Sequence, residues 1–268
     1  MHKGHDCIGI FDSGVGGLTV VRQIIDLLPN ENIVYFGDTA RLPYGSKSEE
    51  TILRYSIENT VFLMEKNIKL LVIACNTATA FAIEKLKKLF NIPIIGVITP
   101  GIERAVISTK NARIGIIGTK GTIQSGAYQR GLQALLPHAS IHPIACPLLV
   151  HLVEDFSLDH LATRLIIQDY LKPLQEQNID TLVLGCTHYP LLKKILYEEI
   201  GKHICLIDPA ITCAQKVQEV LNQNNLNTKQ TTPGTREYFV SDDPKKFSTI
   251  GTQFLGLPLD SVHHHHLT

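Results

Sequence analysis

Two similar stretches decide the fold of this chain: Leu71-Val72-Ile73-Ala74-Cys75-Asn76-Thr77 and Leu182-Val183-Leu184-Gly185-Cys186-Thr187-His188. Each is a short apolar run that ends in a cysteine and continues into residues able to hydrogen-bond. Such runs are typical of strands buried in a parallel sheet. A second pair, Ile8-Gly9-Ile10 and Ile114-Gly115-Ile116, lies at a similar offset, and each member precedes a glycine-rich turn. We therefore predict two similar α/β halves, with chance likeness of two βα units as the alternative.

The rest of the chain alternates short apolar runs with longer amphipathic stretches, which predicts βα units and parallel sheets. Strands are predicted at residues 7–11, 33–36, 70–74, 94–97, 113–117, 141–145, 181–184 and 205–207. Helices are predicted at residues 49–66, 79–90, 158–177, 191–199 and 212–222. The predicted fold class is α/β, with two similar domains of mainly parallel sheet related by pseudo-symmetry and the active site between them.

Two short segments are predicted to connect the halves. Thr99-Pro100-Gly101 would cross from the first half to the second, and Asp208-Pro209 would return. The first α/β domain would then comprise residues 1–98 and 210–268, and the second would comprise residues 99–209.

Composition excludes several classes of function. The 268 residues have a formal net charge of zero, which argues against a nucleic-acid binder or a membrane-surface protein that relies on basic charge. No run approaches the roughly 18 apolar residues of a transmembrane helix. The first six residues contain no apolar signal-peptide core, so we expect a cytoplasmic protein.

No motif predicts a metal or disulfide framework. The six cysteines include no C-x-x-C pair, so we expect free thiols, with Cys7, Cys146, Cys205 and Cys213 as small buried side chains. There is no H-E-x-x-H motif either. The run His263–His266 resembles an expression tag, although two further residues follow it, and we leave it out of the chemistry.

In open α/β sheets, ligands bind beyond the carboxyl ends of the strands. Four motifs are predicted to lie there: Asp12-Ser13-Gly14-Val15-Gly16-Gly17, Gly37-Asp38 with Pro43-Tyr44-Gly45, Cys75-Asn76-Thr77, and Cys186-Thr187-His188. None of the four contains a lysine that could hold pyridoxal phosphate.

The glycine-rich turn after the first strand does not match a nucleotide-binding motif. Thr19 occupies the third glycine position of G-x-G-x-x-G, and no P-loop occurs in the chain. The turn could still offer backbone N–H groups to a carboxylate. The alternative is a tight strand-to-helix turn with no binding role.

The matched cysteines point to proton transfer. A thiol at the start of a helix gains thiolate character, and Asp12 beside Cys75 or His188 beside Cys186 could accept or relay its proton. Two thiols that face each other across a cleft can remove a proton from one face of a carbon and supply one to the other. A mechanism with one nucleophilic cysteine would leave the second unexplained.

The chain resembles the glutamate racemases of the aspartate/glutamate racemase superfamily over nearly its whole length. The resemblance rests on Ile10-Phe11-Asp12-Ser13-Gly14-Val15-Gly16-Gly17, Pro43-Tyr44-Gly45, Cys75-Asn76-Thr77-Ala78 and Gly185-Cys186-Thr187-His188-Tyr189-Pro190. It implies L/D-glutamate interconversion without a cofactor or metal, which supplies D-glutamate for peptidoglycan. It also implies that Cys75 removes the proton of D-glutamate and Cys186 that of L-glutamate.

The resemblance further implies the residues that contact substrate: Asp12, Ser13, Tyr44, Gly45, Asn76, Thr77, Thr187 and His188. Asp38 and Glu154 match acidic positions with supporting roles. His151 departs from the family, which usually has proline there, so the path of the chain to Glu154 is open.

The residues by themselves leave several questions open. No motif contains an arginine that would clamp a carboxylate, so they do not separate glutamate from aspartate or another small diacid. A metabolite- or partner-binding protein without turnover is a further alternative. The oligomeric state, with a homodimer as one option, and regulation by a cell-wall precursor are also open.

Overall fold

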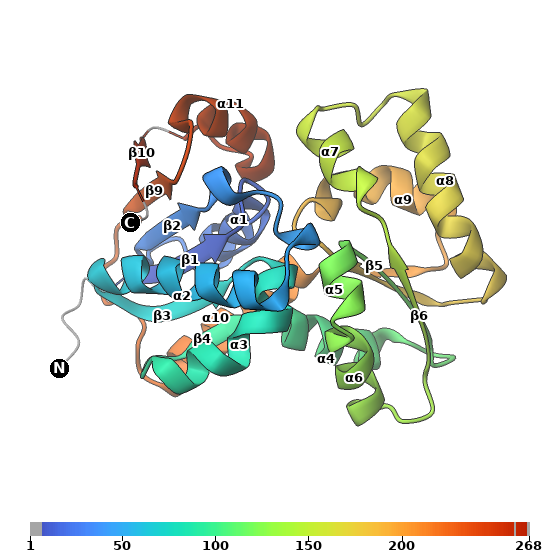
Figure 1. Ribbon diagram of the computed structural model, residues 1–268. Coiled ribbons are helices and arrows are strands. Elements are labelled where there is room, and N and C mark those ends of the chain that lie inside the picture. The colour runs from blue at the N-terminus through green and yellow to red at the C-terminus, as the bar shows by residue number, and fades with distance from the viewer. Residues whose placement is uncertain (1–6, 260, 267–268) are drawn as a thin grey trace.

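Two parallel β-sheets, one in each of two lobes, form the framework of the molecule (Figure 1). The computed structural model describes residues 7–259 and 261–266. The segment 1–6, predicted to lack a signal peptide, lies outside the described residues, as do the last two residues of the chain.

The first sheet has six strands in the order β10-β9-β2-β1-β3-β4, all parallel. Its strands are β1 (Cys7–Asp12), β2 (Ile33–Gly37), β3 (Ile68–Ile73), β4 (Ile94–Gly96), β9 (Arg236–Val240) and β10 (Val262–His264). Every residue of β2 and β3 is buried, which explains why these strands are apolar apart from Lys69, whose ammonium group pairs with Glu31 at 2.5 Å.

The second sheet has four parallel strands in the order β6-β5-β7-β8. They are β5 (Arg113–Gly118), β6 (Ser140–Ala145), β7 (Thr181–Gly185) and β8 (Cys205–Ile207). This order repeats β2-β1-β3-β4 of the first sheet, so β5 corresponds to β1 and β7 to β3. The two similar α/β halves predicted from the sequence are therefore confirmed.

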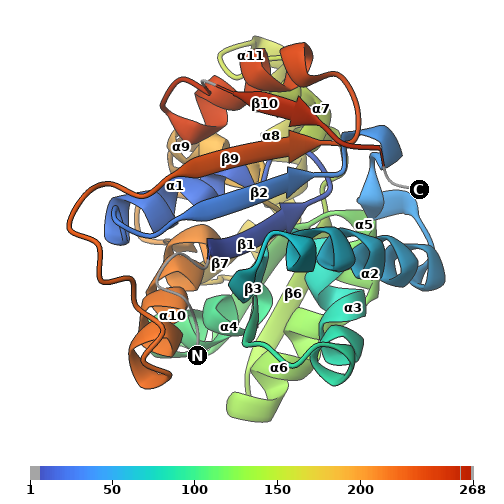
Figure 2. The same cartoon turned by 90° about the vertical axis from the view of Figure 1, so that its left-hand side faces the viewer.

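Helices cover both faces of the first sheet: α1 (Leu18–Leu27), α2 (Glu49–Glu65), α3 (Asn76–Leu89), α10 (Pro209–Gln223) and α11 (Pro244–Leu255). Figure 2 shows α1 and α10 on one side of the strands and α2 and α3 on the other. Alternate residues of β3 point to the two layers: Leu70 and Val72 join the core with α1 and α10, whereas Leu71 and Ile73 join that with α2 and α3.

The second sheet is covered in the same way by α4 (Ile98–Ser108), α5 (Lys120–Gln124), α6 (Ala127–Leu135), α7 (Leu148–Glu154), α8 (Leu161–Glu176) and α9 (Lys193–Ile200). On β7, Val183 packs with α4 and α6, whereas Leu182 and Leu184 pack with α8 and α9. In the described residues, three short 3₁₀ turns complete the element list: η1 (Thr39–Arg41), η2 (Tyr44–Ser46) and η3 (Tyr189–Leu192).

All eight predicted strands are present, but several predicted helix bounds were wrong. The helix predicted at 79–90 begins at Asn76, because the Cys75 side chain caps it. The helix predicted at 158–177 begins at Leu161, capped by His160, and runs through Pro173. The segment predicted at 191–199 is η3 followed by α9. Helices α1, α4–α7 and α11 and strands β9 and β10 were not predicted.

The structure shows the form of two segments that the sequence singled out. Thr99-Pro100-Gly101 lies inside α4, which follows β4 of the first sheet and precedes β5 of the second. His263 and His264, from the run that resembles an expression tag, form β10 and pair in parallel with β9. The C-terminal strands thus extend the first sheet, while the exact domain division at 98/99 and 209/210 stays a prediction.

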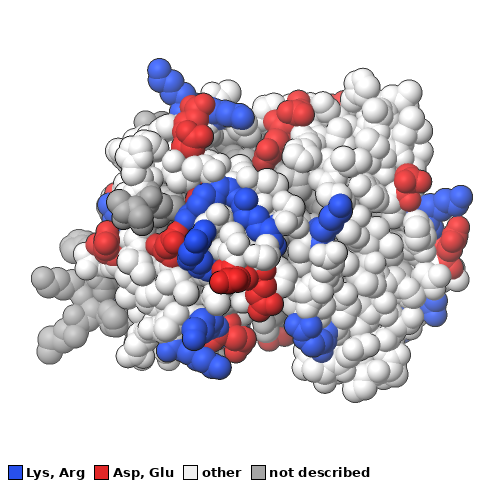
Figure 3. Space-filling view, viewed as in Figure 1, with Lys and Arg blue, Asp and Glu red and all other residues white. Residues whose placement is uncertain are grey.

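The described part of the chain contains no helix long and apolar enough to cross a membrane. On the face seen in Figure 3, lysine and arginine side chains lie among aspartate and glutamate, separated by broad uncharged areas. This face therefore presents charges of both signs rather than a field of one sign.

Candidate active site

A cavity of about 310 Å³ receives side chains from the carboxyl ends of both sheets. Every predicted substrate contact lines it except Asp12, which lies behind its wall. The lining residues are Ser13, Leu42, Pro43, Tyr44, Gly45, Ser46, Cys75, Asn76, Thr77, Thr119, Lys120, Pro147, Val150, His151, Cys186, Thr187 and His188. The four motifs that the sequence placed at strand ends thus meet at one site.

Cys75 occupies the N-cap of α3, directly after β3, and is 6% exposed. Its Sγ accepts a hydrogen bond from the Ala78 amide at 3.4 Å and lies 3.9 Å from Ser13 Oγ. Burial, the charge of Asp12 and the nearby Cys186 raise the pKa of Cys75 to about 12, against the opposing bonds from Ala78 and Ser13. Cys75 is therefore a protonated thiol at neutral pH.

Asp12 is fully buried at the end of β1, between the two cysteine loops. Its Oδ1 accepts a hydrogen bond from the Gly14 amide at 3.0 Å, and its Oδ2 accepts one from the Thr187 hydroxyl at 3.4 Å. Burial raises the pKa of Asp12, while His188 and these hydrogen bonds oppose that rise. Asp12 therefore connects the end of β1 to the loop after β7.

His188 joins Cys186 to a carboxylate. Its Nδ1 lies 3.8 Å from Cys186 Sγ, and its Nε2 lies 2.8 Å from Glu154 Oε1 on α7. Burial lowers the pKa of His188, but Cys186 and Glu154 outweigh burial and raise the pKa to about 10. Cys186 and Glu154 thus favour the protonated form of His188, and a cation beside a thiol is the arrangement that activates catalytic cysteines.

Glu154 reaches this position although His151 departs from the family pattern. Both residues lie on the continuous helix α7, and His151 lines the cavity. Burial raises the pKa of Glu154, but the hydrogen bond and charge of His188 lower it overall. The sequence left open the path of the chain to Glu154. In the structure α7 carries Glu154 to within hydrogen-bonding distance of His188.

The glycine-rich turn supports the loop after β7. A Cβ atom at Gly16 would lie 2.6 Å from His188 Cε1 and would also clash with the Thr187 hydroxyl. The Thr19 hydroxyl donates to the Thr187 carbonyl at 3.0 Å. Gly16 is thus required by close packing against the loop after β7, which explains the glycine without a nucleotide.

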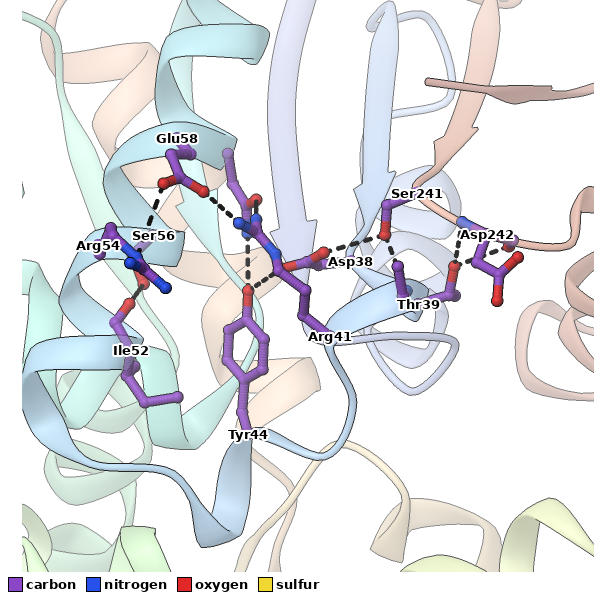
Figure 4. Close-up of polar contacts among 12 residues, drawn as sticks. Asp38, Thr39, Arg41, Tyr44, Ile52, Arg54, Ser56, Glu58, Ser241 and Asp242 are labelled. Carbon is purple, nitrogen blue, oxygen red and sulfur yellow. Dashed lines mark hydrogen bonds and ion pairs between the residues drawn. The ribbon is translucent and has the colours of Figure 1, made fainter. Parts of the chain in front are cut away.

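A second polar network lies beside the cavity (Figure 4). The buried Asp38 carboxylate accepts hydrogen bonds from the Tyr44 hydroxyl, from Arg41 Nε at 2.7 Å and from Ser241 Oγ at 2.9 Å. The Tyr44 hydroxyl also accepts from Asn59 Nδ2 at 3.1 Å. The hydroxyl of Tyr44, a residue that lines the cavity, is therefore hydrogen-bonded to Asp38 and Asn59. The roles predicted for Tyr44 and Asp38 stay predictions.

Comparison with known proteins agrees with this geometry. The family model described as Asp/Glu/Hydantoin racemase matches residues 8–217. The chain belongs to this racemase family. The glutamate racemase of Geobacter metallireducens is 49% identical over 256 residues, covering 96% of this chain and 95% of the relative.

Solved structures are similar over nearly the full length of this racemase. A glutamate racemase isoform from Bacillus anthracis superposes with a TM-score of 0.96 at 38% identity, covering 99% of both chains. The Francisella tularensis glutamate racemase, solved in complex with D-glutamate, has a TM-score of 0.92 at 34% identity and the same coverage. The predicted family and α/β fold, and the assignment of the chain as an amino-acid racemase, are confirmed.

Sequence reasoning missed several polar residues of the racemase site. The Tyr128 hydroxyl donates to Asn76 Oδ1 at 2.8 Å, and Thr77 Oγ1 lies 2.9 Å from Thr119 Oγ1. The sequence repeat contained a signal for Thr119, because Thr119 follows Gly118 at the end of β5 as Ser13 follows Asp12 at the end of β1. Lys120 brings to the cavity a cation that the predicted motifs lacked.

The structure contains no disulfide among the six cysteines of the racemase, all of which lie within residues 7–259. Cys146 and Cys213 are buried, whereas Cys7 and Cys205 are partly buried. Cys75 and Cys186 are the pair that lines the cavity. The sequence repeat distinguished the same two cysteines from the other four.

Proposed function

We propose that this racemase interconverts L- and D-glutamate, with Cys75 and Cys186 as its two acid–base groups. The observation that carries the proposal is that both cysteines end equivalent strands, β3 and β7, and line one cavity. Two thiols placed on opposite sides of a bound α-carbon suffice to invert it, so no cofactor is needed.

In the L-to-D direction, Cys186 acts as the thiolate beside protonated His188 and removes the α-proton. The electrons of the C–H bond remain on the α-carbon, next to the carboxylate. Cys75, held as a thiol, then donates its proton to the opposite face and becomes a thiolate. In the D-to-L direction the two cysteines exchange roles.

The lining of the cavity suits an amino acid with two carboxylates. Asn76 and Thr77 lie in the first turn of α3, where backbone N–H groups favour an anion. Ser13, Thr119 and Thr187 offer hydroxyl donors, and Lys120 offers a positive charge. The D-glutamate bound in the Francisella tularensis relative further supports glutamate as the substrate.

The wider role that we propose rests on the resemblance to glutamate racemases. The D-glutamate would be made in the cytoplasm and used in peptidoglycan synthesis. Residues 1–98 with 210–268 and residues 99–209 would act as the two domains that enclose the substrate.

Circular dichroism of L-glutamate incubated with purified protein and no additive tests the proposal directly. We expect the signal to decay to zero as the mixture becomes racemic. L-Aspartate is the matched control, and its faster decay would assign the site to the shorter diacid. A constant signal with both amino acids would overturn the proposal and favour a binding protein.

A further inference from the structure

Consecutive residues between β2 and α2 form one wall of the active-site cavity. All of them line the cavity: Leu42, Pro43, Tyr44, Gly45 and Ser46. The turn η2 within this stretch packs against the second lobe, because a Cβ atom at Gly45 would lie 2.7 Å from Thr119 Cβ. We call residues 42–46 the wall segment. Its position helps to set the space that a substrate can occupy.

A buried carboxylate holds the wall segment from behind. Asp38, the residue after β2, is 0% exposed and is not part of the cavity lining. Its Oδ2 accepts hydrogen bonds from the Tyr44 hydroxyl and from Arg41 Nε, the latter at 2.7 Å. Tyr44 is 1% exposed, so solvent does not compete for its hydroxyl. The place of Tyr44 in the wall segment therefore depends on how the Asp38 carboxylate is oriented.

The C-terminal part of the chain reaches the same carboxylate through Ser241. This serine follows β9, and its Oγ donates a hydrogen bond to Asp38 Oδ1 at 2.9 Å. The same Oγ accepts a hydrogen bond from the Ala40 amide at 2.9 Å. Figure 4 shows Asp38 between Tyr44 and Ser241. One hydroxyl, 203 positions after Asp38 in the sequence, thus holds both the carboxylate and the backbone that leads to the wall segment.

A neighbouring tether is more open to solvent. Thr39 Oγ1 donates a hydrogen bond to the Asp242 carbonyl at 2.7 Å and accepts one from the Asp242 amide at 2.8 Å. Both contacts are exposed, so water can replace them. The bond from Ser241 differs, because it ends on a carboxylate that solvent does not reach. A buried charged acceptor that loses its donor costs more than an exposed one, so Ser241 is the stronger tether.

We propose that Ser241 is a positioning residue for substrate binding, which fixes the Asp38 carboxylate and, through it, Tyr44 and the wall segment. This inference rests on the proposed function, in which Tyr44 contacts the substrate. Cys75 and Cys186 lie on other elements, directly after β3 and β7. Ser241 should therefore affect the affinity for substrate much more than the proton transfers at the α-carbon.

Variants of one serine, measured by both turnover and binding, test this role. Ser241→Ala should raise KM for glutamate, and Kd from calorimetric titration, by roughly tenfold. The turnover number kcat should stay close to the wild-type value, because loss of binding that substrate and transition state share raises KM alone. Ser241→Thr keeps the hydroxyl and should restore both KM and Kd. Ser248→Ala is the matched control, because the Ser248 hydroxyl donates to the Leu259 carbonyl instead, at 3.3 Å.

A double-mutant cycle tests whether Ser241 acts through Tyr44. Tyr44→Phe removes the hydroxyl that Asp38 holds, so it breaks the same chain of contacts at its other end. Residues in one hydrogen-bond network are not additive. We therefore expect Ser241→Ala to change Kd much less in the Tyr44→Phe protein than in the wild type.

The outcomes separate this inference from the proposed function. If the wild type racemises glutamate but Ser241→Ala behaves like Ser248→Ala, the positioning role is overturned and the proposed function stands. A fall in kcat at unchanged KM, an equal loss in Ser241→Thr, or fully multiplicative effects in the cycle would overturn the role as well. Binding of glutamate without racemisation would overturn the proposed function, while the Kd values would still decide the role of Ser241. Absence of both binding and racemisation would overturn the two together.

Discussion

The hydroxyl of Tyr128, on α6 of the second lobe, donates a 2.8 Å hydrogen bond to Oδ1 of Asn76, the residue after Cys75 in the first lobe. Both side chains are buried, so the bond is made without competition from solvent. It ties the start of α3, which holds Cys75, to the opposite half of the site.

Removing this hydroxyl should affect both stability and activity. Tyr128→Phe leaves a buried amide oxygen without its donor, which should lower the free energy of unfolding by about 1–3 kcal/mol. Tyr189→Phe is the matched control, because its buried hydroxyl donates to the Cys146 carbonyl within one lobe at 2.8 Å. We expect similar losses in urea denaturation but a larger fall in turnover for Tyr128→Phe. Equal turnover in the two variants would show that the contact between lobes does not position Cys75.

The two active-site cysteines should be individually indispensable. Cys75→Ser and Cys186→Ser should each abolish racemisation while far-UV circular dichroism stays unchanged, because a serine hydroxyl is too weak an acid to replace a thiol. Cys205→Ser, outside the cavity, is the control and should retain activity. Turnover near the wild-type rate in either active-site variant would exclude the two-thiol mechanism.

His188→Asn should impair the chemical step of L-to-D conversion more than it weakens substrate binding. Asparagine can still hydrogen-bond but cannot carry a proton for Cys186, and such assistance is typically worth about 10²–10⁴-fold in rate. We expect a fall in kcat of that order with a smaller change in KM, measured in both directions. If kcat is unaltered in both directions, His188 has only a structural role.

Gly16 offers a test of the packing beneath the catalytic loop. In Gly16→Ala, the added methyl group would push Thr187 and His188 from their positions, and a shift of about 1 Å can cost on the order of 10²-fold in rate. Gly14→Ala is the control, because the atoms nearest to its Cβ would belong to the flexible side chain of Leu42, the first of them at 3.1 Å. We expect steady-state turnover to fall sharply in the first variant and mildly in the second. Comparable rates would mean that the loop after β7 accommodates the methyl group.

The repeat made the fold largely predictable. Buried strands of parallel sheets read as apolar runs, so all eight predicted strands were found, and the matched cysteines identified both halves of the site. The strands β9 and β10 were missed because Arg236 and the histidines of β10 are polar, and pairing with β2 and with each other fixes them as strands. That stabilisation comes from residues distant in sequence, which local patterns do not report.

Contacts within the site were predictable only in part. The glycine-rich turn was visible, but the reason for Gly16 is its distance from His188, which depends on how the two lobes pack. Tyr128 carries no motif and lies on a helix that was not predicted. Glu154 was placed by family resemblance alone, because an acidic residue within an apolar stretch does not reveal its partner.

The raised pKa of His188 predicts a dependence of stability on pH. Its pKa is about 10 in the folded protein, against an ordinary value of 6.5, so the folded state binds a proton that the unfolded state has lost between these values. The stabilisation is therefore complete below pH 6.5 and lost as pH rises to about 10. The slope from one such group is at most about 1.4 kcal/mol per pH unit.

Comparison with His188→Asn isolates this group from other titrating side chains. Urea denaturation of both proteins at several pH values between 6 and 10 gives the difference in their free energies of unfolding. We expect the wild type to be the more stable protein near pH 6, and the difference to shrink steadily as His188 loses its proton. A difference that stays constant or grows with pH would mean that His188 is neutral in the folded protein, and the imidazolium beside Cys186 would then have to be abandoned.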